Sequence, residues 1–392
     1  MPKPEPKPKP KPKLVKGALT YIWFQLLFRS HFLEWPWSKL GLTLGTLGLA
    51  MMSTVLCLWL KTPLPWMLGP LMSVALATMF GFRTKSWRAF RNIGQLVIGC
   101  SLGLYFSPEI GQLIISLWWV ILVSILWALL VGAGFGNILY RLHGQDIPGL
   151  TRSACFFSGA IGGASEMTNL AERENGRTDL VAAAHSLRVM LIAIVIPFGL
   201  KALGFQGNPV LGPVAKDIVP LGLMLMFGLA LIVVWFLQRW GRANPWFLGG
   251  LGVSMALSLS GHTLTAVPTW MVNVSQLLIG VSLGVQFSGD FIKSAPKWAL
   301  SVSIGTMSLI AVCCLFALGI SKLSGIETLT MVLGTAPGGI AEMAITAKVL
   351  HLGVPLVTTL QVCRLIAVLI LVEPLYKFCY QEESVTGSSE VI

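Results

Sequence analysis

The chain has few charged residues, few histidines and no cysteines at redox or metal-binding spacing. Only 11% of its 392 residues are charged, against about a quarter in soluble proteins. Its seven cysteines are scattered through apolar segments without a CxxC pair, and its five histidines have no metal-ligand spacing. We therefore expect no metal site and no cofactor. The absence of a phosphate-binding P-loop argues against ATP drive, and with no nucleophile or metal set the chain is not expected to be an enzyme.

Long apolar segments make up most of the chain. Hydrophobic residues account for 55% of it, and the mean hydropathy is +0.77. Several runs, such as 114–138 and 300–320, are long enough to cross a bilayer. The sequence therefore predicts an all-α polytopic membrane protein. The lipid bilayer is an expected partner, and nucleic acid is not, because no soluble domain or recognition motif is present.

An internal repeat is the most informative pattern. Motifs return in the same order after 176 to 181 residues. The matched pairs are Pro65-Trp66-Met67-Leu68-Gly69 with Pro245-Trp246-Phe247-Leu248-Gly249, Asn92 and Gln95 with Asn273 and Gln276, Gly162-Gly163 and Glu166 with Gly338-Gly339 and Glu342, and Arg188 with Arg364. A duplicated unit made of apolar segments is typical of membrane transporters.

The apolar segments form two matched sets. We expect spans near 40–60, 64–82, 92–106, 112–139 and 180–200, and again near 217–238, 245–262, 269–287, 298–320 and 354–376. Each half also has an extra segment rich in small residues, at 153–171 and at 330–347. The expected organisation is a basic Pro/Lys-rich tail with an interfacial helix (1–40), a first repeat (41–205), a second repeat (206–378) and a short tail (379–392).

The two extra segments decide the topology. If each is a re-entrant or broken hairpin, each repeat crosses five times and the repeats are inverted; if each crosses fully, the repeats are parallel. With a cytoplasmic N-terminus, inversion places 13 basic residues inside and 5 outside. Inside are Arg83, Lys85, Arg88, Arg91, Arg141, Arg152, Arg173, Arg177, Arg239, Arg242, Lys293, Lys297 and Lys377; outside are Lys61, Lys201, Lys216, Lys322 and Lys348. The positive-inside rule favours this arrangement, with both termini cytoplasmic.

Two glutamate–arginine pairs lie within apolar segments. Glu166 precedes Arg188 by 22 residues, and Glu342 precedes Arg364 by the same interval. A charge at bilayer depth costs roughly 2.5–3.5 kcal/mol on insertion scales. Each glutamate also follows a Gly-Gly pair, and the second copy adds Pro337. Such a break frees backbone groups that are tolerated in a membrane only where they line a cavity or are buried in protein.

These coincidences predict a solute site. We expect the substrate to be bound by Gly162, Gly163, Ser165, Arg188, Pro337, Gly338, Gly339, Gln361 and Arg364, and a coupling ion by Glu166, His185 and Glu342. The alternative is that each glutamate forms an ion pair with its own arginine, and that this pair has only the structural role of fastening the hairpin to the arginine helix. For His185, which matches Gln361 in position, a core histidine with satisfied hydrogen bonds is as reasonable as a proton carrier.

Two further features recur in both halves. The amides Asn92, Gln95, Asn273 and Gln276 either bridge helices or line the pathway. The motifs from Gly99 to Gly103 and from Gly280 to Gly284 match a GxSxG nucleophile elbow. Because they lie within apolar spans, we interpret them as GxxxG packing motifs.

These residues resemble the AbrB-type integral membrane proteins, a family with a tandem AbrB duplication. The resemblance covers roughly 42–376 and rests on Gly162-Gly163, His185, Arg188, Pro337-Gly338-Gly339, Gln361 and Arg364. The first repeat departs from the pattern, because it lacks the proline and has His185 where glutamine is usual, so the half-sites need not be equivalent. Labels used in the family include ammonia monooxygenase and AbrB regulator. No cluster of histidines or carboxylates here supports the first label.

Together these observations predict a secondary transporter of a small anionic solute. It would be coupled to H⁺ or Na⁺, work by alternating access between inverted repeats, and lie in the bacterial inner (plasma) membrane. Replacing Arg364 with glutamine is expected to abolish uptake and leave the protein folded. A membrane-embedded regulator of gene expression that acts indirectly is the alternative, and a membrane monooxygenase is the weakest one. A homodimer is a further possibility.

Overall fold

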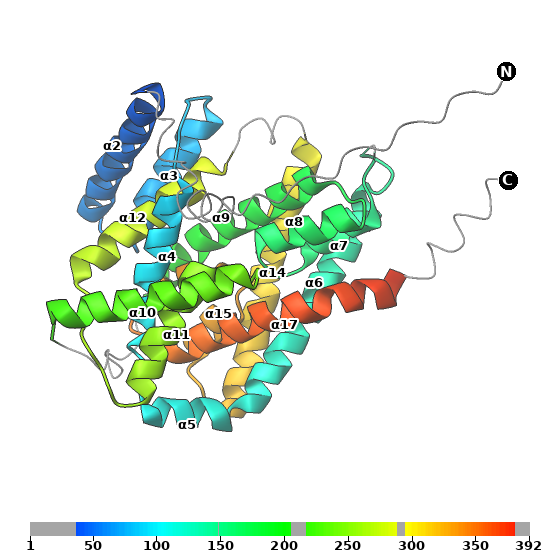
Figure 1. Cartoon of the computed structure of the whole chain (residues 1–392). Helices are drawn as coiled ribbons and strands as arrows, with labels where there is room; N and C mark the ends of the chain where they lie inside the picture. The colour runs from blue at the N-terminus through cyan, green and yellow to red at the C-terminus, as the bar shows by residue number, and fades with distance from the viewer. Residues whose placement is uncertain (1–36, 148, 205–216, 288–294, 381–392) are drawn as a thin grey trace, which may run out of the picture.

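The structure, a computed structural model, describes residues 37–147, 149–204, 217–287 and 295–380. Most of the tail and interfacial helix predicted for 1–40, and the tail from 381, lie outside the described residues. The part described is all helical (Figure 1). Its first half contains α2 (Trp37–Trp59), α3 (Pro65–Met79), α4 (Arg88–Gly103), α5 (Pro108–Ser116), α6 (Trp118–His143), α7 (Arg152–Gly159), α8 (Ala164–Arg173) and α9 (Thr178–Ala202).

The second half follows the same order of helices. It contains α10 (Pro220–Arg239), α11 (Pro245–Leu259), α12 (Thr269–Val285), α14 (Pro296–Ser324), α15 (Thr328–Thr335), α16 (Ile340–Val349) and α17 (Val354–Tyr380). Pro65 and Pro245 each occupy the first turn of a helix, where the missing N–H costs nothing. The helices of the two halves therefore match one to one wherever both are described, apart from α5.

Six helices are long and apolar enough to cross a membrane: α2, α6, α9, α10, α14 and α17. All six fall on predicted spans. The other four predicted spans form shorter helices, α3, α4, α11 and α12, of 15 to 17 residues. At 1.5 Å per residue these helices are about 23–26 Å long, less than the hydrocarbon thickness of about 30 Å. The prediction of a polytopic all-α membrane protein is confirmed.

The four short helices interlock the two halves. α4 packs against α11, and α12 packs against α3. The GxxxG glycines make this possible: a Cβ on Gly99 would overlap the carbonyl oxygen of Phe247, and one on Gly280 would come within 2.5 Å of the carbonyl oxygen of Met67. The interpretation of these motifs as packing motifs is confirmed, since each glycine lets two backbones touch.

Each extra segment is a re-entrant hairpin of two half-helices. α7 has 8 residues and α8 has 10, too few to cross a bilayer. The start of α7 returns to the end of α8, where Ser153 Oγ donates to Glu174 O at 3.1 Å. In the second hairpin, Gly353 N donates to Thr330 Oγ1 at 3.0 Å. Both extra segments are thus hairpins, the arrangement for which the sequence predicts inverted repeats.

One predicted span is interrupted. The sequence predicts a continuous span over 112–139, but α5 ends at Ser116 and α6 begins at Trp118. Ser107 caps α5 by accepting a hydrogen bond from Ile110 N at 3.4 Å, and α5 turns by 91° from α4. It lies across the lower end of the molecule in Figure 1 and joins α4 to α6. Leu113 therefore belongs to a crosswise helix and not to the span.

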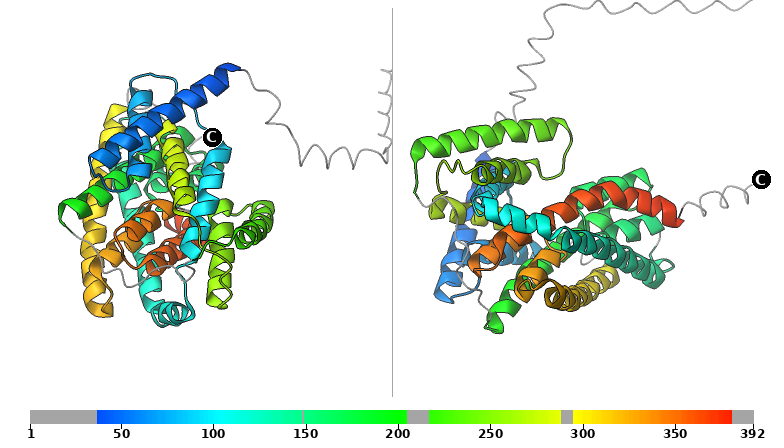
Figure 2. Two further views of the ribbon diagram at one scale, coloured as in Figure 1. Left: turned by 90° about the vertical axis from the view of Figure 1, so that its left-hand side faces the viewer. Right: turned by 90° about the horizontal axis from the view of Figure 1, so that it is seen from below.

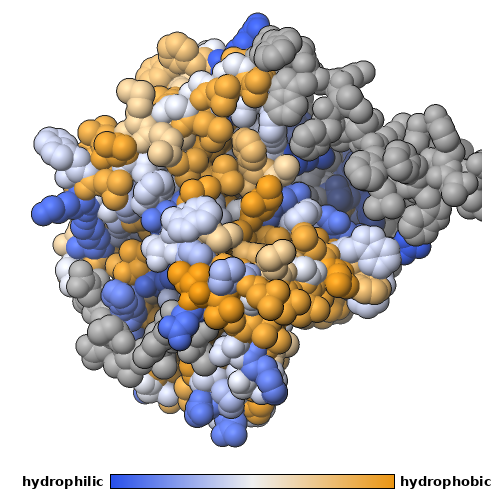
Figure 3. All heavy atoms as spheres, turned by 60° about the vertical axis from the view of Figure 1, so that its left-hand side comes forward, coloured by the Kyte–Doolittle hydropathy of each residue, from blue (hydrophilic) through white to orange (hydrophobic). Residues whose placement is uncertain are grey.

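The outer surface suits a bilayer. Apolar side chains occupy most of the centre of the face in Figure 3, and hydrophilic ones gather at its lower end and left edge. α10 lies at one margin of the molecule, opposite α14 (Figure 2, right). Large apolar residues such as Met52, Met224 and Leu315 are exposed on the long helices. Exposed apolar area of this extent is typical of contact with lipid.

Candidate solute site at the hairpin tips

A cavity of about 780 Å³ lies where the two hairpin tips meet α4 and α9. Twelve of the sixteen predicted site residues line it: Asn92, Gln95, Gly162, Gly163, Ser165, Glu166, His185, Arg188, Pro337, Gly338, Gly339 and Glu342. Gln361, Arg364, Asn273 and Gln276 are not among its lining residues. Segments from both repeats thus form one chamber, as a shared binding site would require.

The two tips have the same backbone conformation. Ala160 and Ala336 end the first half-helices with φ and ψ of −56° and 138° and of −54° and 137°. The proline of the second tip is therefore not needed for the break. A Cβ on either Gly163 or Gly339 would collide with the carboxylate of the glutamate three residues later. Each carboxylate folds back over the N-terminus of its own half-helix, where the helix dipole stabilises negative charge.

Arg188 and Arg364 bind hairpin backbone rather than carboxylates. Arg188 is 2% exposed, and its Nη atoms donate to the carbonyl oxygens of Ser158, Gly159 and Ala160 at 2.8–3.2 Å. Among the described residues neither arginine forms an ion pair with Glu166 or Glu342. The alternative interpretation, in which each glutamate pairs with its own arginine, is therefore wrong.

Arg364 holds the second tip in the same way. It is 5% exposed, and its Nη atoms donate to the carbonyl oxygens of Ala336 at 2.6 Å and Gly338 at 3.1 Å. The carbonyl groups that the two arginines contact belong to the C-terminal end of a half-helix or to the break that follows it, where carbonyl groups without a helical partner attract a cation. Each arginine thus stabilises the break in its hairpin.

His185 and Gln361 perform the same task in the two repeats. Gln361 accepts from Arg364 Nη2 at 2.6 Å and donates through Nε2 to Leu333 O at 2.7 Å. His185 Nδ1 lies 2.8 Å from Arg188 Nη2, and its Nε2 lies 2.9 Å from Phe157 O. Because an arginine can only donate, Nδ1 accepts and Nε2 carries the proton. The geometry favours the core histidine, since a second proton would break the bond to Arg188.

Replacing His185 with glutamine is expected to leave stability nearly unchanged. Glutamine offers the same acceptor and donor, as Gln361 does in the second repeat. Leucine at this position would leave Phe157 O unpaired and is expected to lower the free energy of unfolding by about 1–3 kcal/mol. Thermal unfolding of the two purified variants measures the difference. If glutamine is as harmful as leucine, and uptake then loses its pH dependence, His185 carries the proton after all.

The amides of the two repeats have different surroundings. Asn92 and Gln95 line the cavity, whereas Gln276 is buried and Asn273 is half-buried beside the contact between α4 and α12. At that contact a Cβ on Gly94 would come within 2.9 Å of Ser275 O. The first pair thus faces the chamber, and the second lies in the packed scaffold.

The cavity is also lined by three arginines that the sequence predicts only as cytoplasmic loop charges. Arg88, Arg91 and Arg242 line it, together with Trp246 and Gln286. A signal for two of them was present in the sequence: Arg88, Arg91, Asn92 and Gln95 follow the i, i+3, i+4, i+7 spacing of one helical face. The amides were recognised and the arginines one turn earlier were missed.

The two hairpins differ in how far they are buried. Eight of the ten residues of α16 are buried, but only Met167 and Ala171 of α8 are. α16 packs on α4, where Lys348 Nζ donates to Ser101 Oγ at 2.8 Å. Lys348 therefore lies on a packed helix rather than in the outer loop where the charge count placed it. The second hairpin is closed against the scaffold, and the first leaves the chamber open.

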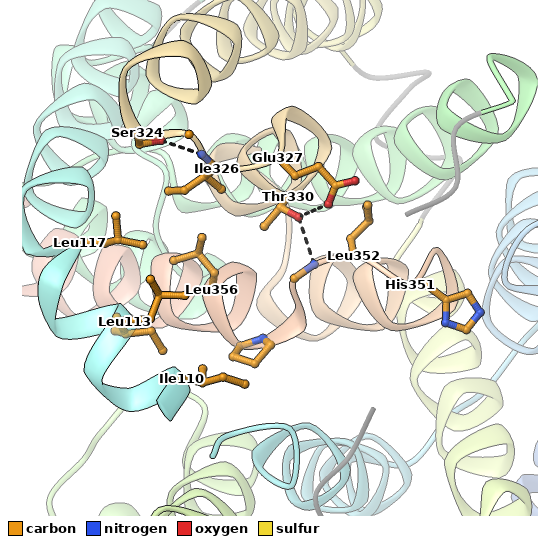
Figure 4. Close-up of a pocket in the computed structure, with 14 residues that line it drawn as sticks. Ile110, Leu113, Leu117, Ser324, Ile326, Glu327, Thr330, His351, Leu352 and Leu356 are labelled. Carbon is orange, nitrogen blue, oxygen red and sulfur yellow. Dashed lines mark hydrogen bonds between the residues drawn. The ribbon is translucent and has the colours of Figure 1, made fainter. Parts of the chain in front are cut away.

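A second cavity of about 560 Å³ lies at the base of the closed hairpin. Figure 4 shows its apolar wall, formed by Leu113 of α5, Leu117 between α5 and α6, and Leu356 of α17. Its polar edge holds the hairpin base together, since Thr330 Oγ1 donates to Glu327 Oε2 at 3.0 Å and accepts from Gly353 N. This cavity shares no lining residue with the larger chamber.

Comparison with known proteins supports one family. Residues 66–380 match the family described as "Transition state regulatory protein AbrB". The chain is 27% identical over 331 residues to "Uncharacterized protein YhjN" of Bacillus subtilis (strain 168), covering 78% of this chain and 84% of that protein. It is 24% identical over 323 residues to "Putative regulator AbrB" of Escherichia coli (strain K12), covering 79% and 88%. No solved structure matches the chain significantly.

Proposed function

The chain belongs to the family described as transition state regulatory protein AbrB, and within that family we propose that it acts as a secondary transporter of a small anionic solute. It works by alternating access between its inverted repeats, in the bacterial inner membrane. The solute occupies the chamber between the hairpin tips. Residues of the two Gly-Gly breaks line that chamber, as in transporters built on interrupted helices.

The observation that carries this proposal is the asymmetry of two symmetric hairpins. The same motif is closed against the scaffold in the second repeat and open in the first. Exchanging the conformations of the repeats would close the first hairpin and open the second. Alternating access requires two such states, built from equivalent repeats, that expose one site to opposite sides of the membrane.

Glu342 and Glu166 are the groups proposed to bind the coupling ion. The side chain of Glu342 is nine-tenths buried, lines the chamber and forms no ion pair with a described residue. A carboxylate in such a place can take up H⁺ or Na⁺ and so offset its charge. Glu166 occupies the matching place in the open hairpin and is half-buried.

The chamber is proposed to face the cytoplasm in this state. Its rim includes Arg88, Arg91 and Arg242, and the base of the open hairpin carries Arg173 and Arg177. Basic residues gather on the cytoplasmic side of membrane proteins. The second cavity, at the base of the closed hairpin, then lies toward the outer face. A homodimer remains a prediction from sequence.

A membrane-embedded regulator is the second candidate. The name of the Escherichia coli relative and the family description both use that term. A regulator would bind a solute or partner in one stable conformation, or switch without moving solute across the membrane. The two candidates therefore differ in whether the opposite hairpin arrangement ever forms.

A cysteine pair at Glu172 and Ser282 is expected to be cross-linked in membranes. These positions correspond in the repeats to Lys348 and Ser101, which are in contact here, so they should approach only in the opposite state. A short bis-methanethiosulfonate reagent, in a background without the native cysteines, detects the approach. A reagent is needed because the long lysine side chain leaves the two backbones too far apart for a direct disulfide.

Two other pairs calibrate this experiment. Cysteines at Ser101 and Lys348 should cross-link readily, because that interface exists in this state. Cysteines at Glu172 and Ser116 should not, because α8 and α5 lie well apart in Figure 1. Efficient cross-linking of the Ser101–Lys348 pair, with none of the Glu172–Ser282 pair at any pH or solute concentration, would contradict alternating access and favour the regulator.

A further inference from the structure

One face of α4 lines the chamber with cations and amides. Arg88, Arg91, Asn92 and Gln95 are spaced so that they share a face of the helix, and all four line the cavity. Arg242 joins them from the loop after α10. The rim of the chamber thus presents three guanidinium groups together with several amide donors.

These guanidinium groups form no ion pair in the described part of the chain, although the charge of Arg91 acts on the nearby Glu342 carboxylate. The ion pairs found there join other residues, Arg177 with Asp179 and Lys377 with Glu373. Arg188 and Arg364, in contrast, already donate from both Nη atoms to hairpin carbonyl groups, and only their buried Nε atoms are left without a partner. The chamber holds four arginines, counting Arg188, and two glutamates, so it carries excess positive charge.

Arg88 and Arg91 place positive charge where the dipole of α4 is unfavourable for it. Both lie in the first turn and a half of α4, which has no acidic residue in its first turn. A cation near a helix N-terminus is unfavourable by roughly 0.3–1 kcal/mol. Where residues are unfavourable for local structure and no contact compensates for them, a functional role is the usual reason. Arg83 and Lys85, in the loop before α4, do not line the cavity. These two cations are enough to mark the loop as cytoplasmic, so that role does not require Arg88 and Arg91.

The cationic face exists in one repeat only. The positions in α12 that correspond to Arg88 and Arg91 are Thr269 and Val272. The rim that would form in the opposite state therefore lacks these two charges. The chamber attracts an anion most strongly in the state described here.

We infer that the substrate is a small organic anion with two or more carboxylates, and that Arg88, Arg91 and Arg242 bind those carboxylates. This rests on the proposed transport function and identifies the class of solute. Each guanidinium fork matches a carboxylate in a bidentate pair, and three unpaired forks can hold more than one. Arg188 and Arg364 then shape the chamber and do not contact the solute.

The test is thermal unfolding of the purified, detergent-solubilised protein with citrate, succinate, inorganic phosphate or ammonium. Citrate and succinate are expected to raise the unfolding temperature of the wild type in a saturable way. Arg91→Gln should weaken their apparent affinity about tenfold or more, since it removes charge-assisted hydrogen bonds. Arg91→Lys should keep part of the affinity. Arg83→Gln, which makes the same change of charge outside the cavity, should not alter it.

Three results would overturn the inference. Equal loss in Arg83→Gln would show a general effect of surface charge. Stabilisation by carboxylates that survives in Arg88→Gln, Arg91→Gln and Arg242→Gln would place the anion elsewhere. Stabilisation by phosphate or ammonium alone, or by none of the four, would exclude the carboxylate class. The Glu172–Ser282 cross-link would still report alternating access in each case, so failure of this inference is distinct from failure of the transport proposal.

Discussion

Arg364→Gln is expected to lose uptake because the second hairpin tip comes apart. The guanidinium group donates to Ala336 O and Gly338 O, and a glutamine cannot reach both carbonyl groups from the same position. Ala336 O keeps the hydrogen bond from Gln361 Nε2 at 3.1 Å, but Gly338 O loses the donor that Arg364 supplies, and a buried carbonyl group left unpaired costs about 1–3 kcal/mol. Hydrogen exchange of the amides around 333–339, together with thermal unfolding, should show faster exchange at the tip and lower stability. The simple expectation of an intact fold with lost uptake is thus replaced by a local structural defect.

Arg364→Lys serves as the matched comparison for this variant. Lysine keeps the charge but offers one point donor in place of a fork, so stability should fall between that of wild type and glutamine. A glutamine variant with normal exchange at the tip and normal stability, yet no uptake, would mean that Arg364 binds the solute directly. That outcome would also contradict the assignment of the anion to the α4 face.

Gly99→Ala is expected to prevent assembly of the scaffold. The added Cβ would overlap Phe247 O and lie 2.9 Å from Leu251 N, and both atoms belong to the backbone of α11. Backbone atoms cannot turn aside as a flexible side chain does, so α4 and α11 must separate along their contact. Overpacking of this kind costs typically about 1–3 kcal/mol and more where nothing can yield. Size-exclusion chromatography and thermal unfolding of the solubilised protein should show aggregation or a large loss of stability.

Gly134→Ala on α6 controls for the loss of a glycine as such. A Cβ there meets nothing within 4 Å, and alanine favours a helix by about 1 kcal/mol. This variant should be as stable as wild type or slightly more so. If Gly99→Ala behaves in the same way, the close contact between α4 and α11 is not present in the protein.

Much of the candidate site could be predicted from the sequence, because its signals are local. The Gly-Gly breaks, the glutamate three residues later and the arginine 22 residues beyond can be read along the chain, and the repeat shows that they are not accidental. Twelve predicted residues line one chamber for that reason. The partners of the arginines could not be predicted, because they are backbone carbonyls and carry no side-chain signature in the sequence.

The sequence by itself determined the class of protein, the duplication, the long spans and the positions of the breaks, because hydropathy and motif spacing depend on residues close together in the chain. Only the tertiary structure decided that the extra segments are re-entrant, since that follows from contacts such as Ser153 with Glu174. It also brought the α4 arginines into the chamber. Finally, it decided which hairpin is closed, because two nearly identical motifs can adopt either conformation and only packing against the scaffold distinguishes them.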